Sequence, residues 1–294
     1  MGAERPIPLA FGRGMKANLW SPRALVRRAK DKGILPHKGL GQHFLLDKGI
    51  ALRIAEVAGV GGEDVVLEIG PGVGSLTFAL AEKAKKVVAV EIDKRLVEFL
   101  KEETAGLNVE ILEGDILEVD LPSLASMEGE MKVVANLPYN LSTKILFYLL
   151  EHRSQLKDLT LMFQREVAER IVSPPRSKNY GVLSVMVRLW AEPKMVMRVP
   201  KGAFWPPPEV EGAVVYFELK KGPGVPDVKA FRRIVEAAFS TRRKTLLNAL
   251  FAAGIAPKER IREILLQCGI DPMRRAETLT LEELIRLTEA TEEV

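Results

Sequence analysis

The chain has 294 residues, of which 47% are hydrophobic and 28% are charged, a composition typical of a soluble globular protein. No apolar run reaches the about 18–20 residues that cross a bilayer, so we expect no membrane partner. The formal charge of +4 and the pI near 9.0 are too mild to establish a nucleic-acid partner from composition alone.

Residues 1–35 form a basic N-terminal extension to which we assign no helix or strand. The extension lacks the apolar core of a signal peptide, although its basic composition leaves a transit peptide as an alternative. The single cysteine, Cys268, excludes an intrachain disulfide and suits a reducing compartment. We therefore predict a cytoplasmic protein.

The next two thirds of the chain alternate between apolar runs and amphipathic segments, a pattern typical of βαβ units with a buried parallel sheet. The predicted strands are Val65–Ile69, Val87–Glu91, Val109–Leu112, Lys132–Ala135 and Leu159–Phe163. The predicted helices are Asp47–Ala58, Ser75–Lys83, Lys94–Lys101, Ser142–Leu150 and Gln164–Ile171.

Two later apolar runs, Met195–Val199 and Ala213–Leu219, are joined by residues 201–211, which contain three consecutive prolines and cannot be helical. We expect an antiparallel hairpin at the sheet edge. Gly222–Pro226 is typical of a linker, and only helical patterns follow it. These helices are predicted at Val228–Phe239, Thr241–Ala253, Lys258–Cys268 and Leu281–Ala290.

A glycine-rich loop follows the first strand of the sheet. Its glycines at 70, 72 and 74 let the backbone approach a ligand, and the helix behind them favours an anionic group. The dinucleotide fingerprint requires glycine where this chain has Ser75, and the observed spacing indicates an S-adenosylmethionine loop. We expect a Rossmann-like, class I S-adenosylmethionine-dependent methyltransferase sheet (α/β) over residues 36–221, and a small all-α domain over 222–294.

Polar side chains stand at the ends of the following strands. Glu91 ends the second strand, where a carboxylate can accept from both ribose hydroxyls, a placement that fits an NAD site equally well. Asp115 follows the third strand and can accept from an adenine amine. Because open α/β sheets bind ligands at this edge, we expect both residues to line one pocket with Asn136, at the end of the fourth strand.

The tetrapeptide Asn136-Leu137-Pro138-Tyr139 supplies what a base amine needs to become a nucleophile. The amide oxygen of Asn136 can accept one N–H, and the carbonyl of Leu137, oriented by the fixed φ of Pro138, can accept the other. Tyr139 offers a flat face for base stacking, worth ~1–3 kcal/mol. The alternative is an ordinary strand followed by a proline turn.

Several basic clusters suggest a surface that follows phosphates. They are Arg27-Arg28-Ala29-Lys30, Arg232-Arg233, Arg242-Arg243-Lys244 and Arg274-Arg275. The three histidines have no ligand spacing, and with one cysteine a zinc site is not expected, so we predict no metal.

Taken together, these motifs resemble those of the rRNA adenine N6,N6-dimethyltransferase family, and more narrowly its bacterial small-subunit (16S) branch. The similarity runs from about residue 38 to 287. Besides the loop and strand ends above, it is carried by the segments Gly39–Leu45, Asn136–Thr143, Phe163–Val167, Phe204–Pro208 and Arg242–Leu246.

The resemblance implies an S-adenosylmethionine site lined by His43, Leu45, Gly70, Glu91, Asp115 and Asn136, and we add Gly72 from the loop. His43 stands where relatives often have asparagine. Asn136, Leu137, Pro138 and Tyr139 would hold the target adenine, and we predict that Phe204 closes its other face. To residues 1–35 we assign RNA contact at most.

The expected function is dimethylation of two adjacent adenosines in a hairpin of 16S rRNA, within the 30S subunit or its precursor, by a monomer. One alternative is the large-subunit methyltransferase of the macrolide-resistance type, which shares the pocket. Another is an assembly checkpoint, in which binding to immature subunits matters more than methyl transfer. An NAD oxidoreductase is disfavoured by Ser75 and by Asn136–Tyr139.

Overall fold

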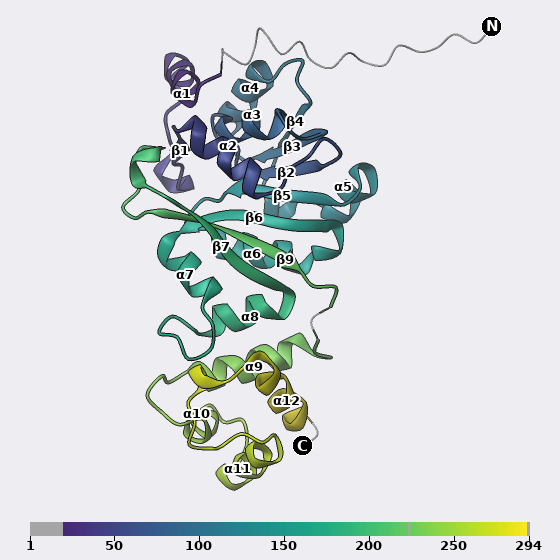
Figure 1. The fold of residues 1–294 in the computed structure, drawn as a ribbon, viewed down its shortest axis with the longest axis vertical. Helices are drawn as coiled ribbons and strands as arrows, with labels where there is room; N and C mark the ends of the chain where they lie inside the picture. The colour runs from purple at the N-terminus through teal and green to yellow at the C-terminus, as the bar shows by residue number, and fades with distance from the viewer. Residues whose placement is uncertain (1–19, 223, 293–294) are drawn as a thin grey trace, which may run out of the picture.

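The computed structural model describes residues 20–222 and 224–292, which form a sheet covered by helices and a helical C-terminal part (Figure 1). The strands of the sheet are β2 (Val65–Ile69), β3 (Lys86–Glu91), β4 (Val109–Glu113), β5 (Met131–Asn136), β6 (Leu156–Gln164), β7 (Ala191–Val199) and β9 (Gly212–Leu219). A two-residue pair, β1 (Phe44–Leu45) with β8 (Phe204–Trp205), lies apart from it.

Seven strands form the main sheet in the order β4-β3-β2-β5-β6-β9-β7. The five strands β2 to β6 pair in parallel, whereas β9 is antiparallel to both β6 and β7. The predicted fold class and the edge hairpin are therefore confirmed. The segment joining β7 to β9 was expected to lack helix, but it contains one 3-10 turn, Lys201–Ala203, before the prolines.

Strand β2 shows why the sheet needs helices on both faces. All five of its residues are buried, and successive side chains enter different cores, with Leu67 and Ile69 in one and Val66 in the other. The covering helices of this part are α2 (Lys48–Val57), α3 (Ser75–Ala81), α4 (Lys94–Glu103), α5 (Leu121–Glu128), α6 (Ser142–Glu151), α7 (Arg165–Val172) and α8 (Val182–Trp190).

The N-terminal extension contains a helix that we did not predict, α1 (Pro22–Asp31). Ser21 caps it, and proline is well suited to its first turn. Just before it, the Trp20 ring stacks on Phe78 at a centroid distance of 5.5 Å and its Nε1 donates to Glu82 at 2.8 Å. Residues 20–35 therefore belong to the folded body, and residues 1–19 lie outside the described part.

The C-terminal part consists of α9 (Val228–Phe239), α10 (Leu246–Ala252), α11 (Lys258–Gln267) and α12 (Leu281–Glu292). Helix α10 begins five residues later than predicted, because Thr245 caps it with a side-chain bond to the N–H of Asn248. The Leu246 N–H is bonded outside the helix, to the Arg274 carbonyl at 2.7 Å.

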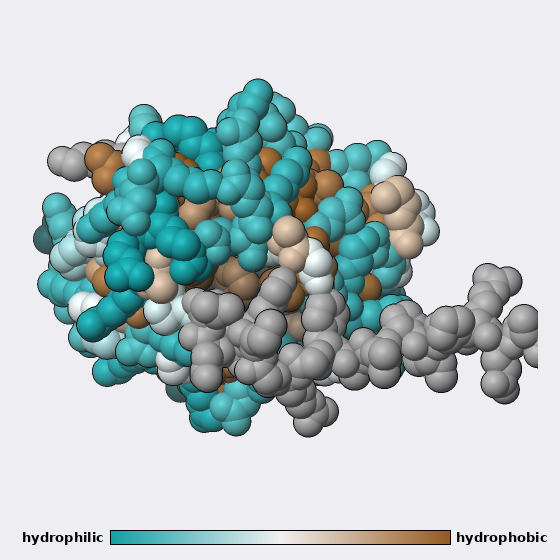
Figure 2. All heavy atoms as spheres, turned by 90° about the horizontal axis from the view of Figure 1, so that it is seen from above, coloured by the Kyte–Doolittle hydropathy of each residue, from teal (hydrophilic) through white to brown (hydrophobic). Residues whose placement is uncertain are grey.

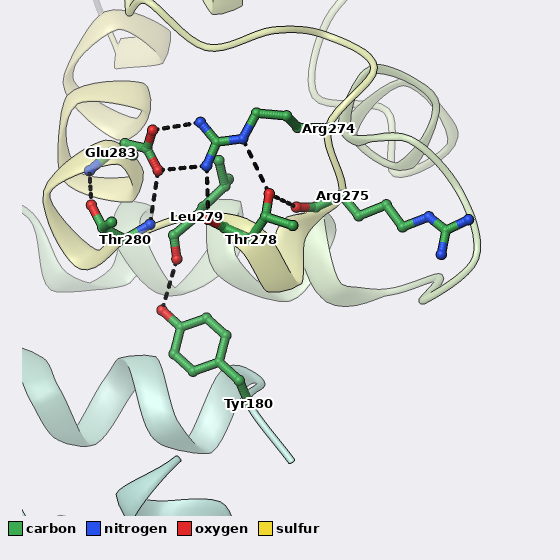
Figure 3. A network of polar contacts seen from close by, with 7 residues as sticks. All are labelled: Tyr180, Arg274, Arg275, Thr278, Leu279, Thr280 and Glu283. Atoms are coloured by element: carbon green, nitrogen blue, oxygen red, sulfur yellow. Dashed lines mark hydrogen bonds and ion pairs between the residues drawn. The ribbon is translucent and has the colours of Figure 1, made fainter. Parts of the chain in front are cut away.

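Figure 3 shows a network of polar contacts in the C-terminal part, which a hydrogen bond from Tyr180 joins to the sheet-bearing part. Tyr180, just before α8, donates its hydroxyl to the Leu279 carbonyl at 3.1 Å. The Arg274 guanidinium binds both oxygens of Glu283, at 2.5 and 2.9 Å, and Glu283 forms a capping box with Thr280. Because both parts contribute to one hydrophobic core, the division at residue 222 stays a proposal.

The surface at the α1–α4 end of the molecule is mostly hydrophilic, with scattered apolar side chains between the polar ones (Figure 2). Within the described residues, no helix is both long and apolar enough to cross a membrane.

Candidate functional site

One cavity lies at the carboxyl ends of β2, β3, β4 and β5, the edge at which ligand binding was predicted. It brings together His43, Gly70, Gly72, Glu91, Asp115 and Asn136. Leu137, Pro138 and Tyr139 line the same cavity. Leu45 lies in a smaller recess beside it, which Gly70 and Asn136 also line.

The glycine loop lines both the cavity and the recess through Gly70 and Gly72. Gly70, Gly72 and Gly74 all have positive φ, a conformation that L side chains rarely adopt. A Cβ at Gly72 would come within 2.9 Å of the Phe44 ring, whereas one at Gly70 would meet nothing within 4 Å. Ser75, where the dinucleotide fingerprint has glycine, donates its hydroxyl to the Leu45 carbonyl at 2.6 Å and so ties the loop to β1.

Glu91 is held at the end of β3 by two backbone donors. Its Oε1 accepts from the N–H of Asp93 at 2.9 Å and its Oε2 from the N–H of Gly72 at 3.2 Å. The side chain is 4% exposed, and burial raises its pKa. Each carboxylate oxygen keeps acceptor capacity after one bond, so this geometry leaves Glu91 able to accept from a ligand hydroxyl.

Glu68, near the end of β2, is a second buried carboxyl at the site that the sequence analysis missed. It is 1% exposed and lines the recess, and its Oε2 has no hydrogen-bond partner among the described residues. Burial raises the pKa of Glu68 to about 8, and the charge of Glu91 reinforces the shift. An acidic residue inside the otherwise apolar run Val65–Ile69 was the available signal.

Asp115 and Gln42 both line the cavity. Asp115 is half-buried and accepts from the Leu117 N–H through Oδ1 at 3.0 Å, which leaves Oδ2 for a ligand donor. Gln42, which the sequence analysis did not single out, lines the cavity and donates to Asp93 at 3.3 Å. This bond joins the segment before β1 to the residues that position Glu91.

The Asn136 amide has a defined orientation. Its Nδ2 donates to the His43 carbonyl at 3.1 Å, and no described residue bonds its Oδ1. This contact fixes which end of the amide is the acceptor. The Leu137 side chain is 1% exposed, so its predicted contribution is through the backbone carbonyl.

Tyr139 is half-buried and lines the cavity. Its ring lies 5.5 Å from the His43 ring, tilted by 32°, and its buried hydroxyl has no partner among the described residues. Burial raises the pKa of Tyr139 to about 12, so it stays a neutral phenol. On the other side, Nδ1 of His43 donates to the Pro206 carbonyl at 2.7 Å, which joins the proline segment to the site.

Phe204 does not line the cavity or the recess, and its role against the adenine stays a prediction. Its side chain is 2% exposed and packs in the core, because pairing of β8 with β1 places it opposite Leu45. The described residues also contain no group of three or more His, Cys, Asp or Glu side chains arranged to hold a metal ion.

The predicted basic clusters divide into paired and unpaired side chains. Arg28 binds Glu103, and Arg232 binds Glu236. Lys30 lies over the Trp205 ring at 4.0 Å. These contacts are structural.

Five exposed basic side chains have no ion pair within the described residues and form what we call the basic junction cluster: Arg176, Lys178, Arg243, Lys244 and Arg275. The backbone brings them together. Arg242 donates to the Lys178 carbonyl and pairs with Glu277 at 3.4 Å, and the Arg176 N–H donates to the Glu277 carbonyl at 2.7 Å. The loop after α7 and the turn before α10, which carry most of them, lie on the same side of the molecule as β1 (Figure 1).

Comparison with known proteins gives a consistent result over nearly the whole described chain. Residues 35–292 match the family described as ribosomal RNA adenine dimethylase. The chain is 44% identical over 279 residues to ribosomal RNA small subunit methyltransferase A of Moorella thermoacetica, covering 91% of this chain and 96% of that protein.

Two solved structures share the fold. A dimethyladenosine transferase from Plasmodium falciparum superposes with a TM-score of 0.71 at 29% identity, covering 83% of this chain and 96% of that one. The 23S rRNA methyltransferase ErmE superposes with a TM-score of 0.65 at 28% identity, covering 85% and 99%.

Proposed function

The chain belongs to the ribosomal RNA adenine dimethylase family, and we propose that it transfers methyl groups to the N6 atoms of two adjacent adenosines in a hairpin of small-subunit rRNA. The observation that carries this proposal is the orientation of Asn136. Its Oδ1 is left as an acceptor at the same edge as Glu91 and Asp115, with the Tyr139 ring beside it.

The methyl donor is S-adenosylmethionine, which supplies a methyl group on a positively charged sulfur. The residues present fit it. We assign the ribose hydroxyls to Glu91, the adenine amine to Asp115, and the close backbone approach to Gly70 and Gly72. The unpartnered Oε2 of Glu68 adds an acceptor in the recess next to the loop.

The target adenine enters beside this site after leaving its stack, at a cost of a few kcal/mol that is smallest in single strands. Asn136 Oδ1 and the Leu137 carbonyl accept the two N6 hydrogens, and Tyr139 stacks on the ring. These bonds favour a pyramidal nitrogen whose lone pair points at the methyl carbon. S-adenosylmethionine held by the residues above would supply the methyl group to this nitrogen, and the amine, oriented by Asn136 and Leu137, would give up one proton to water.

Positioning and electrostatics supply most of this catalysis, so no covalent enzyme intermediate is required. A second methyl group needs the same amine to return with its remaining hydrogen bound by either acceptor. The Asn136 and Leu137 acceptors directly precede the turn that the Leu141 N–H closes by donating to the Pro138 carbonyl at 3.1 Å.

The RNA is held, in our proposal, by the basic junction cluster. Unpaired exposed cations bind phosphates by releasing counterions, and this cluster lies on the side of the molecule that carries β1. The relatives named for the small subunit favour 16S over 23S rRNA, although ErmE shares the fold. A monomeric state and a cytoplasmic location stay predictions from the sequence.

The test is transfer of labelled methyl groups to immature 30S and to 50S particles, followed by primer extension. We expect label in the small-subunit RNA at two adjacent adenosines. Label confined to 23S rRNA would favour the macrolide-resistance type, and absence of label in both particles would contradict the proposal.

A further inference from the structure

Two buried carboxyl groups lie at the cofactor site without a cation beside them. Glu68 is 1% exposed and Glu91 is 4% exposed. Neither has an ion pair within the described residues, and no lysine or arginine lines the cavity or the recess. A buried carboxylate without a countercharge is costly, so such a group takes up a proton or awaits a positive ligand.

The two carboxyls differ in how they are solvated. Glu91 accepts backbone N–H bonds on both oxygens, which favour its charged form. Glu68 Oε2 has no hydrogen-bond partner within the described residues, and no backbone N–H among them donates to this carboxyl. Of the pair, Glu68 is therefore the group that holds a proton when the pocket is empty.

We propose that Glu68 is protonated in the empty pocket and releases its proton to solvent when the cationic cofactor binds, which makes cofactor binding proton-linked. The inference rests on the proposed function, because S-adenosylmethionine supplies the positive charge, carried by sulfonium and ammonium groups. Only the carboxyl O–H bond breaks. The resulting carboxylate then faces a countercharge that the protein itself does not provide.

The other titratable groups around Glu68 fit this assignment. Glu91 on β3 repels a charge on Glu68, and His43 is the one basic side chain among the residues lining the recess. Asp115 and Tyr139 line the wider cavity and not the recess. With a pKa of about 8, Glu68 is mostly protonated at pH 7 in the empty protein.

Titration calorimetry of the full chain with S-adenosylmethionine tests the proposal. In buffers with different ionisation enthalpies, the observed heat changes in proportion to the protons released. We expect release of about 0.9 of a proton at pH 7 and about half a proton at pH 8, with less above it. Affinity should accordingly rise with pH up to about 8 and then level off.

Two variants assign the proton to its residue. Glu68→Gln should still bind the cofactor but lose the release, whereas Glu63→Gln, an exposed acid before the amino end of the same strand, should keep it. Binding with equal heats in all buffers would overturn the inference while leaving the proposed function intact, as would full release by a folded Glu68→Gln. If Glu68→Gln does not fold, the test is the pH at which the wild-type protein releases half a proton on binding. A value below pH 6 overturns the inference. Absence of any binding heat at several temperatures would overturn the proposed function and this inference together.

Discussion

The two edges of the central sheet differ in whether their buried acidic side chains have a cationic partner. At the amino ends of the strands, Asp158 binds Lys132 at 2.6 Å, and nearby Lys86 binds Glu128 at 2.6 Å. At the carboxyl ends, Glu68 and Glu91 are more deeply buried and have no cation within the described residues.

This difference distinguishes charged side chains that stabilise the fold from charged side chains that bind a ligand. A charge that only stabilises the fold is matched inside the chain, because an unmatched buried charge is unfavourable. The carboxyl edge leaves Glu68 and Glu91 unmatched, together with an open amide oxygen on Asn136 and an unpartnered hydroxyl on Tyr139. A ligand is needed to complete that edge, so changes there should affect binding and changes at the other edge should affect stability.

The largest effect is expected for Glu91→Ala at the carboxyl edge. Methyl transfer should fall at least about 100-fold, because the ribose acceptor and the anchor of Gly72 are both lost. Co-sedimentation with 30S particles should persist, since the basic junction cluster is unchanged. The control is Glu113→Ala, an exposed acid at the end of β4. Loss of particle binding as well would argue against a separate RNA-binding surface and a separable checkpoint role.

At the amino edge, Lys132→Met should lower the free energy of unfolding by roughly 3–5 kcal/mol, because it leaves Asp158 buried without its partner. Urea denaturation measures the loss. The affinity for S-adenosylmethionine should stay within about twofold of wild type. Lys85→Met, which removes an exposed lysine just before β3, is the matched control. If Lys132→Met had normal stability but weaker cofactor binding, the assignment of stability to the amino edge and of binding to the carboxyl edge would be contradicted.

Glu68→Gln should stabilise the empty protein, and more so at high pH. The pKa of Glu68 is raised from 4.5 to about 8 on folding, so the folded state binds more protons than the unfolded state between these pH values. Wild-type stability should therefore fall as pH rises across that window, and the variant should lack this loss of roughly 4 kcal/mol. Thermal unfolding of the variant and the wild type at pH 5 and pH 9 measures this difference. An equal change in melting temperature at both pH values would contradict the prediction.

The smallest effect is expected for Tyr139→Phe. The hydroxyl is buried without a partner, so its removal should change the free energy of unfolding by less than about 1 kcal/mol, and in the stabilising direction. Base stacking needs only the ring, so adenosine binding should persist. A destabilisation of several kcal/mol would show that the hydroxyl has a partner in solution.

The parts of the site that depend on short sequence segments were predictable. Strand ends at Glu91 and Asn136, and the positive-φ glycines of the loop, follow from local patterns, and the structure brings them to one cavity. Helix α8 (Val182–Trp190) was missed because it is a short and mostly apolar segment, and such a segment is hard to distinguish from a buried strand by its sequence.

The rest depends on contacts between distant segments. The inward position of Phe204 is set by pairing with Leu45, about 160 residues away, and no local pattern signals that pairing. Glu68 lacks a partner because the fold places no cationic side chain beside it within the described residues. The sequence alone does not reveal this absence. Both the buried position of Phe204 and the omission of Glu68 therefore concern tertiary surroundings.

The most direct test of the central claim is mass spectrometry of nucleosides from immature small-subunit rRNA treated with the protein and S-adenosylmethionine. We predict N6,N6-dimethyladenosine with the wild-type protein, and its loss with Asn136→Ala, which removes the amide acceptor at the carboxyl edge. Unmodified adenosine after wild-type treatment, or equal dimethylation by both proteins, would contradict the account.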